Sequence, residues 1–91
     1  MRRLLITHRH VALDRSDDYL VAWKDVVTGV AAAGGRAWLF RGAGHEDQFI
    51  EFIEWTDEAG DPLDSDDAEA AFANLASFAP ARQSDEWEEV T

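Results

Sequence analysis

Two histidines and an arginine lie together near the start of the chain, inside an otherwise aliphatic stretch. His8, Arg9 and His10 interrupt the run from Leu4 to Leu13, which has no glycine or proline. Such a run predicts a strand, on which alternate residues face opposite sides. We therefore expect both histidines on one face and Arg9 on the other. Histidine can exchange protons near neutral pH and arginine can bind anions, so this strand is a candidate site.

The two histidines raise the question of a metal site. With a carboxylate from a neighbouring strand, Glu51 or Glu54, they would form a two-histidine, one-carboxylate site for a divalent cation. The competing interpretation is that they are hydrogen-bonded or solvated near a strand end. We favour the second interpretation and predict neither a metal nor a cofactor.

Three further polar features are weaker candidates. Arg9 and Arg41 could bind an anionic substrate or an oxygen-derived anion in an apolar cavity, but pairing with surface carboxylates is the commoner role. Asn74 could face a pocket from the second predicted helix. The acidic connection that contains Asp57 and Asp67 lacks the glycine and glutamate positions of an EF-hand loop, so we interpret it as solvated.

The composition narrows the class of protein. The 91 residues are enough for one domain, and the net charge of −11 disfavours nucleic acid and anionic membranes as partners. There is no cysteine, which excludes disulfides and thiol chemistry. Only three apolar residues follow Arg3 before Thr7, too few for a signal peptide, so we expect a cytoplasmic protein.

The remaining elements are predicted from periodicity and capping signals. A helix should follow Asp14 and end at Gly34-Gly35, because one apolar stripe contains Tyr19, Trp23, Val26, Val27 and Val30. A second helix should begin after Ser65 and stop at Pro80, with a stripe of Ala68, Ala71, Phe72, Leu75 and Phe78. The tail, residues 83 to 91, ends in Trp87-Glu88-Glu89-Val90-Thr91, which is predicted as a short fourth strand, with a loose acidic end as the alternative.

Between the helices, residues 36 to 55 are predicted to form a β-hairpin whose second strand is Phe49 to Trp55. If Arg41 lies opposite Asp47, each strand contributes large apolar side chains to both faces of the sheet. One face would carry Trp38, Phe40, Ile50 and Phe52, and the other Leu39, Phe49, Ile53 and Trp55.

The order of elements predicts an α+β fold of ferredoxin-like type, β-α-β-β-α-β, over residues 1–91. Right-handed crossovers give a four-stranded antiparallel sheet in the order 4-1-3-2, with both helices on one face. The other face would expose one of the two aromatic sets. A patch of that extent is typical of an interface, so we predict a homodimer that forms through this sheet face.

The chain resembles the dimeric α/β-barrel superfamily, and within it the small antibiotic-biosynthesis-monooxygenase type. The resemblance rests on element order, length and the run Phe52-Ile53-Glu54-Trp55-Thr56-Asp57, in which Trp55 is the matching residue. It implies that Trp55 forms the wall of a pocket between sheet and helices, where it could stack on a flat ligand; core or interface packing is the alternative. Haem-degrading members use a histidine on the second helix, which this chain lacks.

Two functions follow as hypotheses. The first is a cofactor-independent monooxygenase, or a binder of small aromatic ligands, with Trp55, His8 and Arg9 as site residues. Its physical basis is the group of polar residues midway along a buried strand. The second is a non-catalytic dimeric scaffold or regulatory module whose aromatic residues only pack.

Overall fold

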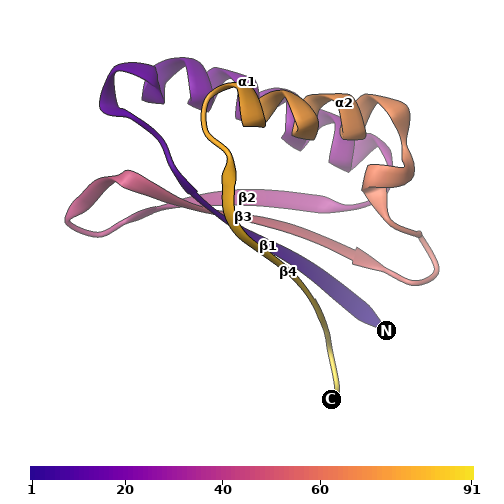
Figure 1. Ribbon diagram of the computed structural model, residues 1–91. Coiled ribbons are helices and arrows are strands. Elements are labelled where there is room, and N and C mark those ends of the chain that lie inside the picture. The colour runs from indigo at the N-terminus through magenta and orange to yellow at the C-terminus, as the bar shows by residue number, and fades with distance from the viewer.

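One antiparallel sheet of four strands carries two helices on a single face (Figure 1). The computed structural model describes all residues from 1 to 91. The strands and helices, in chain order, are β1 (Arg2–His10), α1 (Ser16–Ala32), β2 (Arg36–Gly42), β3 (His45–Thr56), α2 (Asp66–Asn74) and β4 (Ala81–Glu88). The sheet order is β2-β3-β1-β4, the predicted order read from the opposite edge. The ferredoxin-like α+β fold is thus confirmed.

Helix α1 packs on the sheet through most of the predicted stripe. Tyr19, Trp23, Val26 and Val30 are buried, but Val27 is 37% exposed. The prediction for Val27 is wrong because the stripe is completed by Ala22 and Gly29, the small residues on the other side of Val26. The helix ends before Gly34, whose φ of +87° is the left-handed conformation expected of the residue that follows a helix.

Helix α2 is shorter than predicted. It ends at Asn74 and continues as a 3-10 turn, Leu75–Ser77, before Pro80. Ser65 is the N-cap residue, but its side chain makes no capping hydrogen bond. Ala68 and Leu75 are buried under the helix, and the other members of the predicted stripe pack partly buried against the core: Ala71, Phe72 and Phe78. Neither helix is long and apolar enough to span a membrane.

The β2–β3 hairpin has a tighter turn than predicted. Strand β3 already begins at His45, and only two residues, Ala43 and Gly44, connect it to β2. The ladder is irregular between Arg41 and Gly42, and beyond this point Arg41 pairs with Phe49 and not with Asp47. The register differs by two residues, an even number, so each side chain keeps its predicted face. Trp38 pairs with Phe52, which places the two aromatic sets as expected.

Strands β1 and β4 also differ from their predicted bounds. Strand β1 ends at His10, and Val11 is fully buried beyond it in the core. Strand β4 begins at Ala81, earlier than predicted, and runs antiparallel beside β1 as far as Glu88. A fourth strand is therefore present, but it lies mostly before Trp87, and Glu89 to Thr91 are outside it.

The two faces of the sheet have different environments. The helix face of β3 is buried and consists of Phe49, Glu51, Ile53 and Trp55. The opposite face, which we call the open face, has no helix over it (Figure 1). It carries Leu4, Ile6, His8, His10, Trp38, Phe40, Ile50, Phe52 and Trp87. Trp38 stacks on Phe52 at 6.1 Å between ring centroids, while Phe40 remains 55% exposed.

Candidate functional site: a buried Arg-Glu-Tyr cluster

A polar cluster lies in the core between the sheet and helix α1. Arg9 of β1 and Glu51 of β3 are diagonal neighbours on the helix face, since Thr7 pairs with Glu51 and Arg9 with Phe49. Tyr19 reaches them from the first turns of α1. Their exposed fractions are 4% for Arg9, 1% for Glu51 and 0% for Tyr19. We call these three residues the buried triad.

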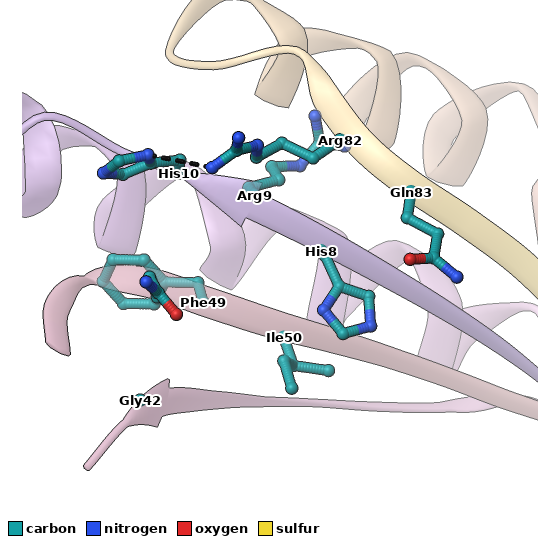
Figure 2. A pocket seen from close by; sticks show the side chains of 9 residues that line it. His8, Arg9, His10, Gly42, Phe49, Ile50, Arg82 and Gln83 are labelled. Carbon is teal, nitrogen blue, oxygen red and sulfur yellow. Dashed lines mark hydrogen bonds between the residues drawn. The ribbon is translucent and has the colours of Figure 1, made fainter.

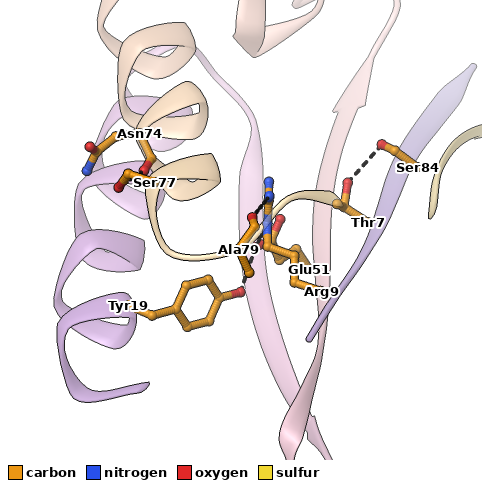
Figure 3. Close-up of polar contacts among 8 residues, drawn as sticks. All are labelled: Thr7, Arg9, Tyr19, Glu51, Asn74, Ser77, Ala79 and Ser84. Atoms are coloured by element: carbon orange, nitrogen blue, oxygen red, sulfur yellow. Dashed lines mark hydrogen bonds and ion pairs between the residues drawn. The ribbon is translucent and has the colours of Figure 1, made fainter. Parts of the chain in front are cut away.

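One carboxylate oxygen joins the buried triad (Figure 3). Arg9 Nε donates to Glu51 Oε2 at 2.7 Å, and the Tyr19 hydroxyl donates to the same oxygen at 2.6 Å. Arg9 Nη1 also donates to the carbonyl oxygen of Ala79 at 2.8 Å, which ties β1 to the segment after α2. Strand β1 and helix α1 therefore meet at Glu51 of β3, and Arg9 links this contact to the segment after α2.

The other carboxylate oxygen, Glu51 Oε1, is buried and has no hydrogen-bond partner. An unsatisfied buried acceptor costs about 1 to 3 kcal/mol, and more when it is charged. Most buried polar atoms in proteins are paired, so an unpaired oxygen in the middle of a core requires an explanation beyond packing. Glu51 Oε1 is consequently an acceptor that a ligand could use.

Burial changes the acid–base properties of two members of the buried triad. Loss of hydration raises the pKa of Glu51 above its ordinary value, against the opposing hydrogen bonds from Tyr19 and Arg9. Loss of hydration also raises the pKa of Tyr19 far above its ordinary value, and the adjacent Glu51 charge adds to the effect. Tyr19 therefore stays a hydroxyl donor, and Glu51 is a stronger base than a carboxylate in water.

The surroundings of the buried triad are aromatic. The Arg9 guanidinium lies 5.5 Å from the centre of the Phe72 ring, and the Tyr19 ring packs against Phe49 at 4.9 Å and Phe78 at 6.4 Å. This packing keeps water from the carboxylate. It would also present flat apolar walls to an aromatic molecule that displaced one of these rings.

Two of the three predicted site residues, His8 and Arg9, line one cavity, and Trp55 lies apart from them. Arg9 belongs to the buried triad, but His8 is exposed on the open face. Trp55 shares the helix face with Arg9, yet it lies opposite Arg3 at the other end of β1. Trp55 is 5% exposed and lines none of the three cavities on the molecule. Its position is that of a core residue.

The metal hypothesis fails on geometry. His8 and His10 share the open face as expected, but Glu51 points to the helix face and Glu54 pairs with Leu4, four residues from His8. No group of three His, Cys, Asp or Glu side chains is arranged to hold a metal ion. His10 instead contacts the carboxylate of Asp47 through Nε2.

The other sequence candidates lie at the surface. Asn74 is exposed on α2 and points away from the buried triad (Figure 3). Arg41 is exposed, with its guanidinium 5.4 Å from the centre of the Phe49 ring, and makes no ion pair with a carboxylate. The acidic connection contributes Asp57, which bonds Arg3 at 2.9 Å. Neither Asn74 nor Arg41 takes part in the buried cluster.

Sequence reasoning missed the roles of Glu51 and Tyr19. Glu51 was considered only as a metal ligand, and Tyr19 only as part of an apolar stripe. The signal was nevertheless present, because alternation assigns Glu51 to the same face as Phe49 and Ile53, which the helices cover. A carboxylate on a covered face requires a buried partner.

Comparison with known proteins shows the fold. No family model matches the chain, and no curated protein matches it in sequence. Among solved structures, a substituted variant of SnoaB, a cofactor-independent oxygenase from Streptomyces nogalater, has 12% identity and a TM-score of 0.80, with 99% of this chain and 94% of that chain covered. Rv0793 from Mycobacterium tuberculosis has 12% identity and a TM-score of 0.78, with 100% and 97% covered. A protein named antibiotic biosynthesis monooxygenase has 16% identity and a TM-score of 0.72, with both chains fully covered. The chain therefore has the ferredoxin-like fold of antibiotic-biosynthesis-monooxygenase-type proteins.

Proposed function

We propose that this protein binds a small phenol or quinol at the buried triad and oxidises it with molecular oxygen, without a cofactor. The observation that carries the proposal is the unpartnered Oε1 of Glu51, a base with one free acceptor in an aromatic surrounding. The similarity in fold to a cofactor-independent oxygenase adds support at the level of architecture only.

In this proposal Glu51 acts as the general base. The substrate hydroxyl donates to Oε1 and transfers its proton there, while Tyr19 and Arg9 hold Oε2 in place. Burial favours the neutral carboxyl that results, which drives the transfer. The phenolate so formed is a better electron donor to oxygen than the neutral phenol.

The overall reaction balances without an added reductant. A phenol with a free ring C–H position and one O₂ give a quinone and one water. One oxygen atom becomes the new carbonyl and the other leaves in the water, which takes both hydrogens that the substrate loses. The four electrons that reduce O₂ all come from the substrate, so no flavin or metal has to supply them.

Access to the buried triad requires movement of the segment that covers it. Phe72 and Phe78 are half-buried, and both belong to the region where α2 gives way to a 3-10 turn. Displacement of either ring would open a path from solvent to the triad. We propose this segment as the entrance for the ligand.

The test is ligand binding measured by the melting temperature of the whole protein. A phenol or quinol that binds at the triad should raise the melting temperature of the wild type and not that of Glu51→Gln, which keeps the side-chain shape but removes the base. Equal shifts in both proteins would contradict binding at Glu51.

We also propose that the chain forms a homodimer through the open face. Four large apolar side chains lie there without cover: Trp38, Phe40, Phe52 and Trp87. Contiguous apolar surfaces of this kind are uncommon on monomers. A second copy placed on the same face would bury them in a symmetric contact.

One observation favours the non-catalytic alternative. None of the three cavities is lined by Glu51, Tyr19 or Trp55, so the space between helices and sheet is filled. A dimeric module without chemistry would need no opening there. This alternative predicts that no phenol or quinol changes the melting temperature of the wild type or of Glu51→Gln.

A further inference from the structure

A cavity of about 400 Å³ opens on the open face, where the end of β1 meets the beginning of β4 (Figure 2). Arg9 of the buried triad also lines this cavity, but its guanidinium is already bonded to Glu51 and to the carbonyl oxygen of Ala79. The chain has 19 acidic residues, yet none of them lines this cavity. Each of the other two cavities contains carboxylates, Glu54, Glu88 and Glu89 in one and Glu46 and Asp47 in the other. The cavity therefore lacks the acidic side chains that give the whole protein its net negative charge.

Arg82 supplies the positive charge of this cavity that no carboxylate neutralises. It makes no ion pair with any carboxylate, whereas Arg2, Arg3 and Arg9 all do. Its only side-chain hydrogen bond runs from Nη1 to His10 Nδ1 at 3.2 Å (Figure 2). An arginine is charged at every physiological pH and has five N–H donors. Most of the donors of Arg82 therefore remain available to a ligand.

His10 lies between Arg82 and the carboxylate of Asp47. Because Nδ1 accepts from Arg82, the ring proton lies on Nε2 and is donated to Asp47. Asp47 lines a different cavity. Gln83 similarly engages Asp85, the next acidic residue along β4, by a hydrogen bond of 2.7 Å. Neither of these two carboxylates reaches the cavity to neutralise the guanidinium.

The remaining walls suit a small organic molecule. Gln83 and the exposed ring of His8 offer polar groups, and Ile50 offers an apolar surface (Figure 2). Gln48 also lines the cavity and adds a side-chain amide. The volume lies within the range of small-ligand sites, about 300 to 1,000 Å³. We infer that this cavity binds a small organic oxyanion, a carboxylate or a phosphate ester, paired with Arg82 and in contact with Ile50. A guanidinium matches both groups in a bidentate geometry.

This site goes beyond the proposed oxidation and does not depend on it. A second copy of the chain on the open face would cover the cavity and shield the ion pair from water, which strengthens it. The site would then be enclosed between two sheets. Its ligand would be independent of the chemistry at Glu51.

The test is titration of the whole protein with four matched probes, benzoate, phenyl phosphate, benzyl alcohol and benzylamine, followed by NMR. We expect one or both anions to bind saturably and to shift signals of Arg82 and His8, and the neutral and cationic probes not to bind. Arg82→Gln should weaken binding about tenfold or more, as expected for a charged hydrogen-bonded pair. Arg36→Gln is the control, because it removes the same charge from the same sheet at a residue that lines no cavity.

A second variant adds a charge instead of removing one. Gln83→Glu places a carboxylate in the cavity at nearly constant shape and should abolish anion binding. The inference is overturned if neither anion binds saturably, if benzyl alcohol binds as well as benzoate, or if Arg82→Gln and Arg36→Gln weaken binding equally. Binding of only one anion would support the site and identify its class of ligand.

Discussion

The hydroxyl of Tyr19 donates a 2.6 Å hydrogen bond to Glu51 Oε2 and thereby joins helix α1 to the middle of the sheet. Both groups are almost fully buried, so water cannot take the place of one partner if the other is removed. This contact therefore helps to stabilise the fold, and it also forms part of the candidate site.

Replacement of Tyr19 by phenylalanine should therefore be costly. Tyr19→Phe removes one of two donors to a buried carboxylate and should lower the free energy of unfolding by about 1 to 3 kcal/mol, measured by urea denaturation near pH 7. Ser77→Ala is the control, since it removes an exposed hydroxyl that bonds only the Asn74 carbonyl. Its effect should stay within about 0.5 kcal/mol. Equal effects for the two variants would mean that Glu51 does not depend on Tyr19.

The ion pair between Arg9 and Glu51 should show strong coupling. Arg9→Met alone leaves a buried charge without its partner and should cost about 3 to 5 kcal/mol of unfolding free energy. The double variant Arg9→Met/Glu51→Met removes both charges and should recover most of that loss, because the core around them is aromatic. A double-mutant cycle measures the coupling. Additive losses would show that the two side chains act independently.

The pKa of Glu51 predicts the sign of a pH effect. Because burial raises that pKa, the folded state binds more protons than the unfolded state above about pH 4. Stability from this group is therefore greatest at low pH and declines as pH rises toward the folded-state pKa. Glu51→Gln should lack this decline, so its stability relative to wild type should be higher at pH 7 than at pH 4.5. Urea denaturation at both pH values measures the difference, and a pH-independent difference would contradict it.

Two exposed carboxylates change the stability with pH in the opposite direction from Glu51, but they do not affect the comparison of wild type with Glu51→Gln. Hydrogen bonds from His10 and Arg3 lower the pKa values of Asp47 and Asp57, respectively. These two groups contribute stability above their unfolded-state pKa values and lose it as pH falls. Both are present in wild type and in Glu51→Gln, so their contribution cancels in the difference between the two proteins.

The proposed dimer depends on the stacked pair Trp38 and Phe52. Truncation of either ring, Trp38→Ala or Phe52→Ala, should weaken self-association by about thirtyfold or more if these side chains lie at the centre of the interface. Analytical ultracentrifugation over a concentration series measures the change. Val21→Ala, on the solvent side of α1, should leave association unchanged. A wild-type protein that sediments as a monomer at all concentrations would refute the dimer.

Much of the fold could be predicted from local patterns. The alternation in Phe49 to Trp55 and the stripe through Tyr19 and Trp23 predicted which residues meet in the core. The register of the β2–β3 hairpin differs from the prediction, because it depends on the two-residue Ala43-Gly44 turn and on the irregularity of the ladder between Arg41 and Gly42. Paired residues kept their faces only because the shift was even.

The site was harder to predict because it depends on tertiary contacts. Arg9 was identified from its place in an aliphatic run, but its partners come from a different strand and a helix. The resemblance drew attention to Trp55, which the structure places in the core, away from Arg9. Single-sequence patterns predict faces well, but they do not predict which polar side chains on one face will meet.

Oxygen uptake is the most direct test of the central claim. The wild-type protein, freed of metals by chelation, should consume oxygen with at least one phenol or quinol faster than buffer does. Glu51→Gln should lose most of this rate, since a general base typically contributes about 10²- to 10⁴-fold. Uptake no faster than in buffer across a broad panel, or an undiminished rate in a folded Glu51→Gln protein, would contradict it.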